Sequence, residues 1–289
     1  ATVAVRRAVA VGTSIRPPGE DVAAGQMVFP PGTVLGAGHL GVLASVGMRR
    51  APVFPRIRVG VLSTGDELVE GPGPLAPGKI RDSNRRTLLA LVGQANADPV
   101  DLGLVADDEA AITAALTDGA NACDAILTSG GVSVGDFDYI KVVLDRLSGG
   151  TMEWMQVAIK PAKPFAFGTI GDTPVFGLPG NPVSSMVSFE CFARPAIRQM
   201  MGHPRIDRAE VAAVADEPLH RRPDGKLHLV RVRVEWSDAD GRFHLRSSGG
   251  QASNLLRSMA LANALALLPD GEGVEAGADV RVRLLNWPD

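Results

Sequence analysis

The segment DAILTSGGVSVGDFDY (residues 124–139) decides the fold class of this chain. It begins as a short apolar strand, turns through a glycine-rich loop and enters the helical pattern DYIKVVLDRL (138–147). The segment PVFGLPGNPVSS (174–185) repeats this succession of strand, turn and helix start. Strands that alternate with helices of this length indicate βαβ units, and hence a mostly parallel sheet with helices on both faces.

The same alternation runs through residues 55–201. The apolar runs IRVGVLS (57–63) and VDLGLV (100–105) have the length of buried strands, and helical patterns follow them at 83–97 and 107–119. We therefore predict a central α/β domain over residues 55–201, with a mostly parallel sheet between two layers of helices.

Local signals predict where the helices of this domain begin and end. Asp107 or Asp108 is a suitable N-cap for the second helix, and Gly119 is a suitable end for it. Asn181 is a suitable N-cap for the last helix, with Pro182 in the first helical position. Pro195 is expected to kink or end that helix.

Two segments of different character flank the α/β domain. Residues 1–54 are rich in Gly, Pro and Val, and they predict the remnant of a β-rich N-terminal region with a short helix at 39–48, ended by Gly47. Residues 202–289 contain short stretches that alternate apolar and polar side chains, such as KLHLVRVRVEW (226–236). This pattern predicts a small antiparallel β-domain resembling a barrel.

Composition excludes several classes of protein. The chain has 289 residues, is 45% hydrophobic and 21% charged, and carries a formal net charge of −3, so it lacks a basic field for nucleic acid. No apolar run reaches the length of a membrane span. Cys123 and Cys191 form no CxxC pair, and we expect two reduced thiols in the core of a cytoplasmic protein.

Ligands of a parallel sheet bind at the carboxyl ends of its strands. The glycines of SGGVSVGDFDY, Gly130, Gly131 and Gly135, permit tight turns and a close approach of the backbone to a ligand. Together with the helix that follows, their N–H groups could cradle a phosphate. The alternative interpretation is a glycine-rich connection with an aspartate N-cap.

The segment LPGNPVSS (178–185) is a second candidate anion site at the same edge of the sheet. Its helix start combines Asn181 and Pro182 with the hydroxyl groups of Ser184 and Ser185. The alternative interpretation is simply a well-capped helix.

Acidic residues follow several of the predicted strands. Asp66 and Glu67 come after the first strand, Asp107 after the second, and Asp138 after the glycine loop, with Asp82 at a helix start. Carboxylates gathered at one edge can hold Mg²⁺ together with substrate phosphates. Each aspartate taken alone is more often an N-cap than a metal ligand.

Lys160 and Lys163 lie in the proline-braced segment KPAKPFAFG (160–168). Two cations facing the acidic edge would suit an anionic substrate, and the prolines argue against the alternative of two solvated surface lysines. The histidines all fall outside the α/β segment, so no Ser-His-Asp arrangement is expected.

The motifs STGDEL (63–68), TSGGVSVG (128–135), KPAKPFAFG and GLPGNPVS (177–184) occur in this order and spacing in a known family. The chain resembles the molybdopterin molybdenumtransferases of the MoeA and gephyrin E-domain type along essentially its whole length, including RPPGED (16–21). The resemblance implies insertion of molybdenum from molybdate into adenylylated molybdopterin, with release of AMP in an Mg²⁺-dependent reaction. It also implies a homodimer.

The resemblance assigns roles to individual residues by motif. It implies that the catalytic residues are Asp66, Glu67, Asp138 and Lys160, and that the Mg²⁺ ligands are Glu67, Asp107 and Asp138. It implies substrate binding by Arg16, Asp21, Ser63, Thr64, Gly130, Gly131, Ser133, Gly135, Lys163, Pro179, Gly180, Asn181, Pro182 and Ser184. Glycine amides and lysines would hold the pterin and the pyrophosphate, and a loop of backbone donors could bind molybdate.

The sequence departs from the family pattern in several places. Pro17 and Pro18 stand where relatives often have arginine, Ala162 where the pattern usually has glycine, and Gln156 where some members have lysine. The family also normally has a further stretch before RPPGED that contributes site residues across a dimer interface. The chain starts at Ala1, which suggests a fragment or N-terminal processing, and we expect low activity from residues 1–289 alone.

Two other functions are open on the sequence. A non-catalytic scaffold that keeps the molybdopterin-binding fold would account for the gephyrin resemblance, but the retained acids and lysines favour the enzyme. A molybdopterin adenylyltransferase would share the α/β domain, but the C-terminal β-domain and the GED segment count against it.

Overall fold

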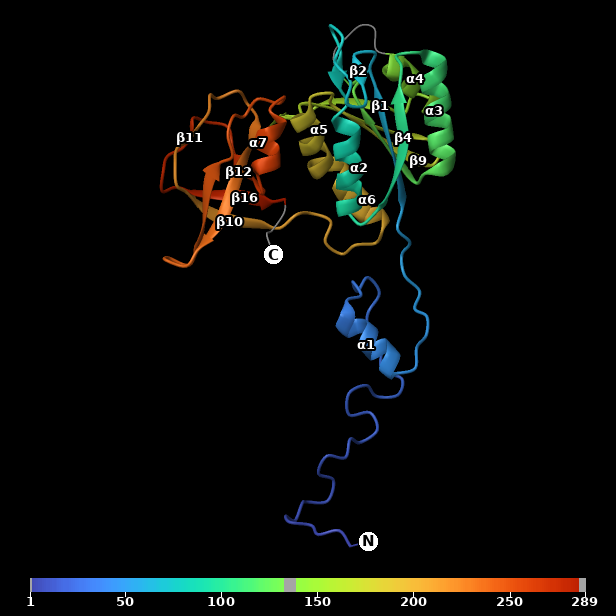
Figure 1. The fold of residues 1–289 in the computed structure, drawn as a ribbon, viewed down its shortest axis with the longest axis vertical. Helices are drawn as coiled ribbons and strands as arrows, with labels where there is room; N and C mark the ends of the chain where they lie inside the picture. The colour runs from blue at the N-terminus through green and yellow to red at the C-terminus, as the bar shows by residue number, and fades with distance from the viewer. Residues whose placement is uncertain (1, 133–138, 286–289) are drawn as a thin grey trace. The chain divides into compact units, whose positions relative to one another are not determined.

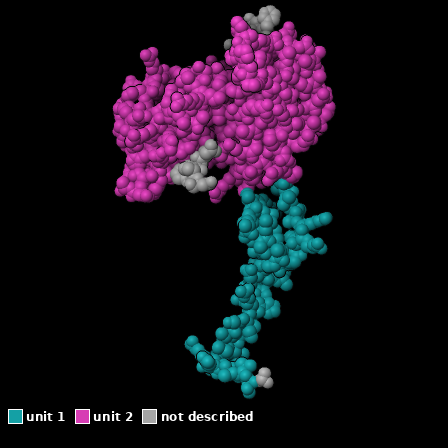
Figure 2. Space-filling view, viewed as in Figure 1, with its two compact units in different colours: residues 1–54 teal, residues 55–289 magenta. Residues whose placement is uncertain are grey.

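The computed structural model describes residues 2–132 and 139–285 (Figure 1). The chain divides into two compact units, residues 1–54 and 55–289, which Figure 2 colours separately. In the part of the chain described, no helix is long and apolar enough to cross a membrane.

The first unit contains one helix, α1 (Ala37–Ser45), and no strand among its described residues. The predicted helix is therefore confirmed, with Gly47 in the left-handed conformation (φ +80°) just beyond its end. The strands predicted in this segment are wrong, because no other described segment of the unit pairs with them and their side chains are largely exposed.

The second unit contains the predicted sheet. Its six strands lie in the order β4 (Asp98–Val105), β1 (Arg58–Thr64), β5 (Ala125–Ser129), β9 (Thr173–Leu178), β8 (Pro164–Ile170) and β6 (Glu153–Gln156). The first four are parallel, whereas β8 runs antiparallel to both of its neighbours. The prediction of a mostly parallel sheet is confirmed.

Helices cover both faces of this sheet (Figure 1). The helices α2 (Asn84–Gln94), α5 (Pro182–Ser188) and α6 (Arg194–Met200) lie on one face, and α3 (Glu109–Ala122) and α4 (Tyr139–Leu147) on the other.

The pleat of strand β1 explains the two layers. Val59 and Val61 pack with Leu88 of α2, whereas Leu62 packs with Ile112 of α3, and all five side chains are fully buried. Burial of such a side chain stabilises the fold by about 1.5–3 kcal/mol. The three-layer α/β/α arrangement is therefore confirmed.

The helix boundaries confirm some predicted signals and correct others. Asp108 is the N-cap of α3, and its side chain accepts a hydrogen bond from the Ala111 N–H at 2.8 Å. The predicted end at Gly119 is wrong, because α3 continues to Ala122. Glycine is needed at position 119 for packing instead, since a Cβ there would lie 2.8 Å from Leu102 Cδ1.

The last helix of the domain does not end at Pro195. A π-helical segment, η1 (Phe189–Ala193), joins α5 to α6, and Pro195 is the second residue of α6. Because the hydrogen-bond pattern changes directly before the proline, its missing N–H falls at a helix start and is tolerated.

The C-terminal part forms a closed barrel. Its strands β13 (Arg242–Ser247), β10 (Glu210–Ala215), β16 (Asp279–Leu284), β14 (Ala264–Leu268) and β12 (Leu227–Ser237) are neighbours in this order, and β12 pairs back to β13. Only β10 and β13 are parallel within this ring of described strands. The predicted small antiparallel β-domain is confirmed apart from this one pair.

Short elements complete the second unit. They are β2 (Leu68–Val69), β3 (Ile80–Arg81), β7 (Ile159–Lys160), β11 (Leu219–His220), β15 (Gly273–Val274) and α7 (Leu256–Leu261). Strand β7 belongs to the α/β region by sequence, but it pairs with β12 of the barrel, with Ile159 opposite Leu227. This pairing ties the lysine segment to the C-terminal sheet.

Candidate active site

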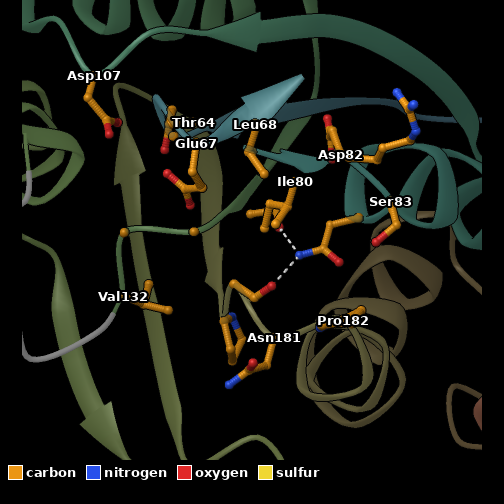
Figure 3. A pocket seen from close by; sticks show the side chains of 18 of the residues that line it. Thr64, Glu67, Leu68, Ile80, Asp82, Ser83, Asp107, Val132, Asn181 and Pro182 are labelled. Atoms are coloured by element: carbon orange, nitrogen blue, oxygen red, sulfur yellow. Dashed lines mark hydrogen bonds between the residues drawn. The ribbon is translucent and has the colours of Figure 1, made fainter. Parts of the chain in front are cut away.

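The carboxyl ends of strands β1, β5 and β9 surround a cavity of about 580 Å³ (Figure 3). Its lining includes residues of all four predicted motifs and of the segment that runs from β3 to the start of α2. These are Thr64, Gly65, Glu67, Leu68, Ile80, Arg81, Asp82, Ser83, Asn84, Asp107, Ser129, Gly130, Gly131, Val132, Tyr139, Pro164, Pro179, Gly180, Asn181 and Pro182. The structure thus brings together the loops that the sequence placed at one sheet edge.

Glycine at position 130 is required by the close approach of two strand ends. Its φ is +99°, and its N–H donates a hydrogen bond to the Leu178 carbonyl oxygen at 3.1 Å. A Cβ at this position would lie 3.1 Å from the carbonyl oxygen of Thr64. The main chain at Gly130 therefore lies close to the ends of the neighbouring strands and borders the cavity, as a phosphate cradle requires.

Asn84, at the start of α2, connects two of the loops. Its Nδ2 donates to Ser129 Oγ at 2.8 Å and to the Gly180 carbonyl oxygen at 2.7 Å. Neither Asn84 nor Ser129 was predicted as a site residue. The signal for Asn84 was its place in the helix start IRDSNR, whereas Ser129 had none beyond its position at a strand end.

The PGNP loop takes the predicted place. Pro182 is the first residue of α5, and Asn181 precedes it in an extended conformation. The Asn181 side chain makes no capping hydrogen bond, so its amide remains available to a ligand in the cavity that it lines. Pro179 and Gly180 line the same cavity.

Three acidic residues of the predicted edge line the cavity, Glu67, Asp82 and Asp107 (Figure 3). Gly65 makes room for the first, because a Cβ there would lie 2.9 Å from a Glu67 carboxylate oxygen. Asp66 does not line the cavity. Its carboxylate instead accepts the backbone N–H of Asp107 at 3.1 Å.

Asp82 lines the cavity but is held by its own hydrogen bonds, one of them from Ser63, which does not line the cavity. The Asp82 side chain is only 1% exposed, and it accepts hydrogen bonds from Arg85 Nε at 3.2 Å and Ser63 Oγ at 3.3 Å. Arg85 also contacts Asp101 and Glu70. Burial opposes the charge of Arg85, but the hydrogen bonds that Arg85 donates to Asp101 and Asp82 outweigh it and raise the pKa of Arg85.

The donor set suits Mg²⁺ in part. Mg²⁺ in proteins commonly takes one or two carboxylates and completes its shell with substrate phosphates and water. Glu67 and Asp107 can supply the two carboxylates, and within residues 2–132 and 139–285 no group of three or more His, Cys, Asp or Glu could hold a metal. The predicted residues Ser133, Gly135 and Asp138 lie outside the described residues.

The predicted lysines lie elsewhere. Lys160 and Lys163 line a second cavity of about 920 Å³, which we call the lysine groove, and neither lines the first cavity. The lysines line a different cavity because β7 carries Lys160 onto the barrel strand β12, and their facing the acidic edge stays a prediction. Ser184 also lines the lysine groove, and Pro164 lines both cavities.

Arg231, a lining residue of the lysine groove, is fully buried. Its Nη2 donates to the carbonyl oxygens of Gly250 at 2.7 Å and Ala252 at 3.1 Å. Its Nε and Nη1 have no hydrogen-bond partner among the residues described, and burial lowers its pKa. A buried guanidinium with unsatisfied donors is costly unless an anion can reach it. Sequence reasoning missed this residue.

Ala162 explains one departure from the family pattern. It is 2% exposed and has a φ of +81°, a left-handed conformation that favours glycine. The usual glycine in KPxKP is thus the residue that this backbone prefers.

Arg16 and Asp21 are exposed residues of the first unit, and their part in the site stays a prediction.

Comparison with known proteins agrees with this arrangement. Residues 60–199 match the family described as a probable molybdopterin binding domain. Residues 212–285 match the MoeA C-terminal region (domain IV), and residues 1–47 match the MoeA N-terminal region (domains I and II). Fold and site thus define the class as an α/β protein with a molybdopterin-binding domain and a MoeA-type barrel.

Individual relatives narrow this class. A molybdopterin molybdenumtransferase of Haemophilus influenzae is 37% identical over 94% of this chain and 67% of its own length. Molybdopterin molybdenumtransferase 2 of Mycobacterium tuberculosis is 39% identical over 97% of this chain and 69% of its own length. The chain belongs to the molybdopterin molybdenumtransferase (MoeA) family of molybdenum cofactor biosynthesis.

A solved structure supports the same fold. The molybdopterin biosynthesis MoeA protein from Pyrococcus horikoshii superposes with a TM-score of 0.76 at 26% identity, over 93% of this chain and 64% of that one. The chain therefore spans about two thirds of the length of these relatives.

Proposed function

We propose that this protein inserts molybdenum from molybdate into adenylylated molybdopterin and releases AMP in an Mg²⁺-dependent reaction. The observation that carries the proposal is a pair of cavities of opposite chemistry that share Pro164. One combines acidic side chains with the main chain of Gly130 and of the segment 179–182. The other gathers lysines around a buried arginine with unsatisfied donors.

The first cavity suits the phosphate-bearing part of the substrate. Main-chain groups near Gly130 and the start of α5 can approach phosphate oxygens closely. Glu67 and Asp107 would hold Mg²⁺, which when bound neutralises phosphate charge. Asp138 belongs to the proposed site through the family motif. By fixing the phosphate against these groups, the cavity would orient it for cleavage.

The lysine groove suits molybdate. A tetrahedral dianion can accept hydrogen bonds from several converging donors, and charge-assisted bonds are the strongest of these. Lys160, Lys163, Ser184 and Arg231 offer such donors in the groove. We therefore place molybdate here, in preference to the glycine loop after β5.

Three further points of the proposal rest on the family resemblance. They are a homodimer, a contribution of Arg16 and Asp21 to the site, and a location in the cytoplasm. Nucleic acid is not a proposed partner, since the net charge is −3.

The test is AMP release from adenylylated molybdopterin in the presence of molybdate and Mg²⁺. Glu67→Gln should lower the rate at least about tenfold, because it removes a charge from the proposed metal site. Glu153→Gln, an exposed substitution on strand β6, should leave the rate unchanged. Binding of both substrates without AMP release above background would contradict the proposal and favour a non-catalytic scaffold.

A further inference from the structure

The lysine groove contains an acidic residue of its own. Of the residues that line it, Asp224 alone is acidic, among the cations Lys160, Lys163, Arg221, Arg222, Lys226 and Arg231. This carboxylate therefore lies among the cations that would bind an anion in the groove.

Asp224 contacts four of the positive or hydrogen-bonding groups around it. Its carboxylate accepts from Arg221 Nη2 at 2.8 Å and from Lys226 Nζ at 3.2 Å, and it bonds His228 Nε2 at 3.0 Å. Lys160 Nζ lies 4.0 Å from its Oδ2. One unit of the positive charge of the groove is therefore already neutralised by Asp224, which lies within reach of several of the cations.

The position of Asp224 is fixed by its surroundings. Its backbone N–H donates to Asp270 Oδ1 at 3.0 Å. Its partner Arg221 is held by the carbonyl oxygens of Lys226 at 2.7 Å and Leu268 at 2.9 Å. Burial acts against ionisation, but hydrogen bonds from His228 and Lys226 lower the pKa of Asp224 to about 2. The carboxylate is thus charged and held in place.

We propose that Asp224 is an internal counter-ion that limits the affinity of the lysine groove for oxyanions. The inference rests on the proposed function, which places molybdate in this groove. A fixed negative charge lowers the local potential, and the resulting loss of binding free energy grows in proportion to the charge of the ligand. Asp224 therefore weakens the binding of dianions more than that of monoanions and favours their release.

This proportionality provides a specific test. Molybdate and perrhenate are both tetrahedral oxyanions, but the first carries two negative charges and the second carries one. Asp224→Asn keeps an acceptor oxygen for Arg221 while removing the charge. It should raise the affinity for molybdate about tenfold and that for perrhenate about threefold, the square root of the first factor.

Three further variants distinguish the effect of removing the Asp224 charge from an effect on folding. Asp224→Glu keeps the charge and should give no rise in affinity. Asp279→Asn makes the same charge change in the same barrel, at an exposed residue paired with Arg242 and outside the groove, and should have no effect. Asp224→Ser also removes the charge. It takes the place of Asp224→Asn if circular dichroism shows that Asp224→Asn is unfolded.

Equilibrium dialysis of the full chain with each anion gives distinct outcomes. No binding of molybdate by the unaltered protein contradicts the proposed function, whatever Asp224 does. Binding by the unaltered protein, with folded Asp224→Asn equal to it or weaker, overturns the inference alone. An equal gain for molybdate and perrhenate also overturns it, because a purely structural role predicts no dependence on ligand charge.

Discussion

Asp66 and Asp107 hold each other through reciprocal hydrogen bonds between side chain and main chain. The Asp66 carboxylate accepts the Asp107 N–H at 3.1 Å, and the Asp107 carboxylate accepts the Asp66 N–H at 3.2 Å. The two residues follow the neighbouring strands β1 and β4. The bonds therefore fix one loop against the other and leave Glu67, the next residue along the chain, to line the cavity.

The first prediction concerns this reciprocal pair. Asp66→Ala removes one of the two bonds and should lower the free energy of unfolding by about 0.5–1 kcal/mol, as for other partly exposed hydrogen bonds. Because the two bonds close the same pair of loops, Asp66→Ala and Asp107→Ala should show a coupling energy of about 0.5 kcal/mol or more in a double-mutant cycle measured by urea denaturation.

Asp108, the neighbour of Asp107, provides the control variant, because its side chain caps helix α3 and does not bond to Asp66. Asp108→Ala removes the N-cap of α3 and should cost about 1 kcal/mol. It should not couple to Asp66→Ala, since Asp108 bonds only within its own helix start. Strict additivity of Asp66→Ala and Asp107→Ala would show that the reciprocal bonds do not act as a unit.

Asn84 provides the second prediction. Asn84→Ala leaves Ser129 Oγ and the Gly180 carbonyl oxygen without this donor, and should lower the free energy of unfolding by about 1–2 kcal/mol. Ser83→Ala is the matched control, because the Ser83 side chain makes no capping bond at the same helix start. Thermal unfolding measures both, and equal effects of the two substitutions would refute the connecting role of Asn84.

The third prediction separates backbone strain from crowding at Gly65. Gly65→Ala places a Cβ against the Glu67 carboxylate in a backbone with φ of +146°, whereas Gly78→Ala meets open space at φ of +78°. Both should lose about 1 kcal/mol of stability through strain. Only Gly65→Ala should also raise the Mg²⁺ concentration needed for half-maximal AMP release. The same Mg²⁺ dependence in both variants would argue against a metal-binding role for Glu67.

The fourth prediction concerns pH and a surface histidine. His244 Nδ1 lies 2.6 Å from Asp216 Oδ1, and its Nε2 lies 3.0 Å from Asp240 Oδ2. These hydrogen bonds raise the pKa of His244 above its ordinary value of 6.5. The stabilisation is therefore fully present below pH 6.5 and is lost as the pH rises through the folded-state pKa.

Urea denaturation at a series of pH values tests whether the stabilisation from His244 is lost as the pH rises. The difference in free energy of unfolding between the unaltered protein and His244→Gln should shrink as the pH rises from about 6 to about 9. His220→Gln, at an exposed histidine of the same barrel, is the control for a general effect of pH. A difference that stays constant or grows with pH would contradict the prediction.

Much of the site was predictable because parallel strands end at a common edge. Gly130, Glu67, Asp107 and Asn181 follow different strands, so a correct sheet was enough to bring them together. Their detailed roles were not predictable. Whether an aspartate lines a cavity or caps a neighbouring loop, as Asp66 does, depends on hydrogen bonds between loops far apart in the sequence.

The lysine groove lay beyond sequence reasoning for a related reason. Lys160 lines the lysine groove because β7 pairs with a strand that begins at Leu227. This contact joins segments far apart in the sequence, and no local sequence pattern predicts it. Arg231 and Arg233 stand at alternate positions of that strand, yet the first is fully buried and the side chain of the second is 63% exposed. Pattern alone gives no means to tell them apart.

The central claim is that the first cavity binds the phosphate-bearing part of the substrate and the lysine groove binds molybdate. The most direct test is calorimetric titration of both ligands into two variants, each altered in one cavity. Lys163→Gln should weaken molybdate binding at least about fivefold and leave Mg²⁺-dependent AMP binding unchanged, because it removes a charge from the lysine groove alone. Glu67→Gln should weaken AMP binding by a similar factor and leave molybdate binding unchanged. Loss of both ligands in either folded variant would contradict the assignment of the two ligands to separate cavities.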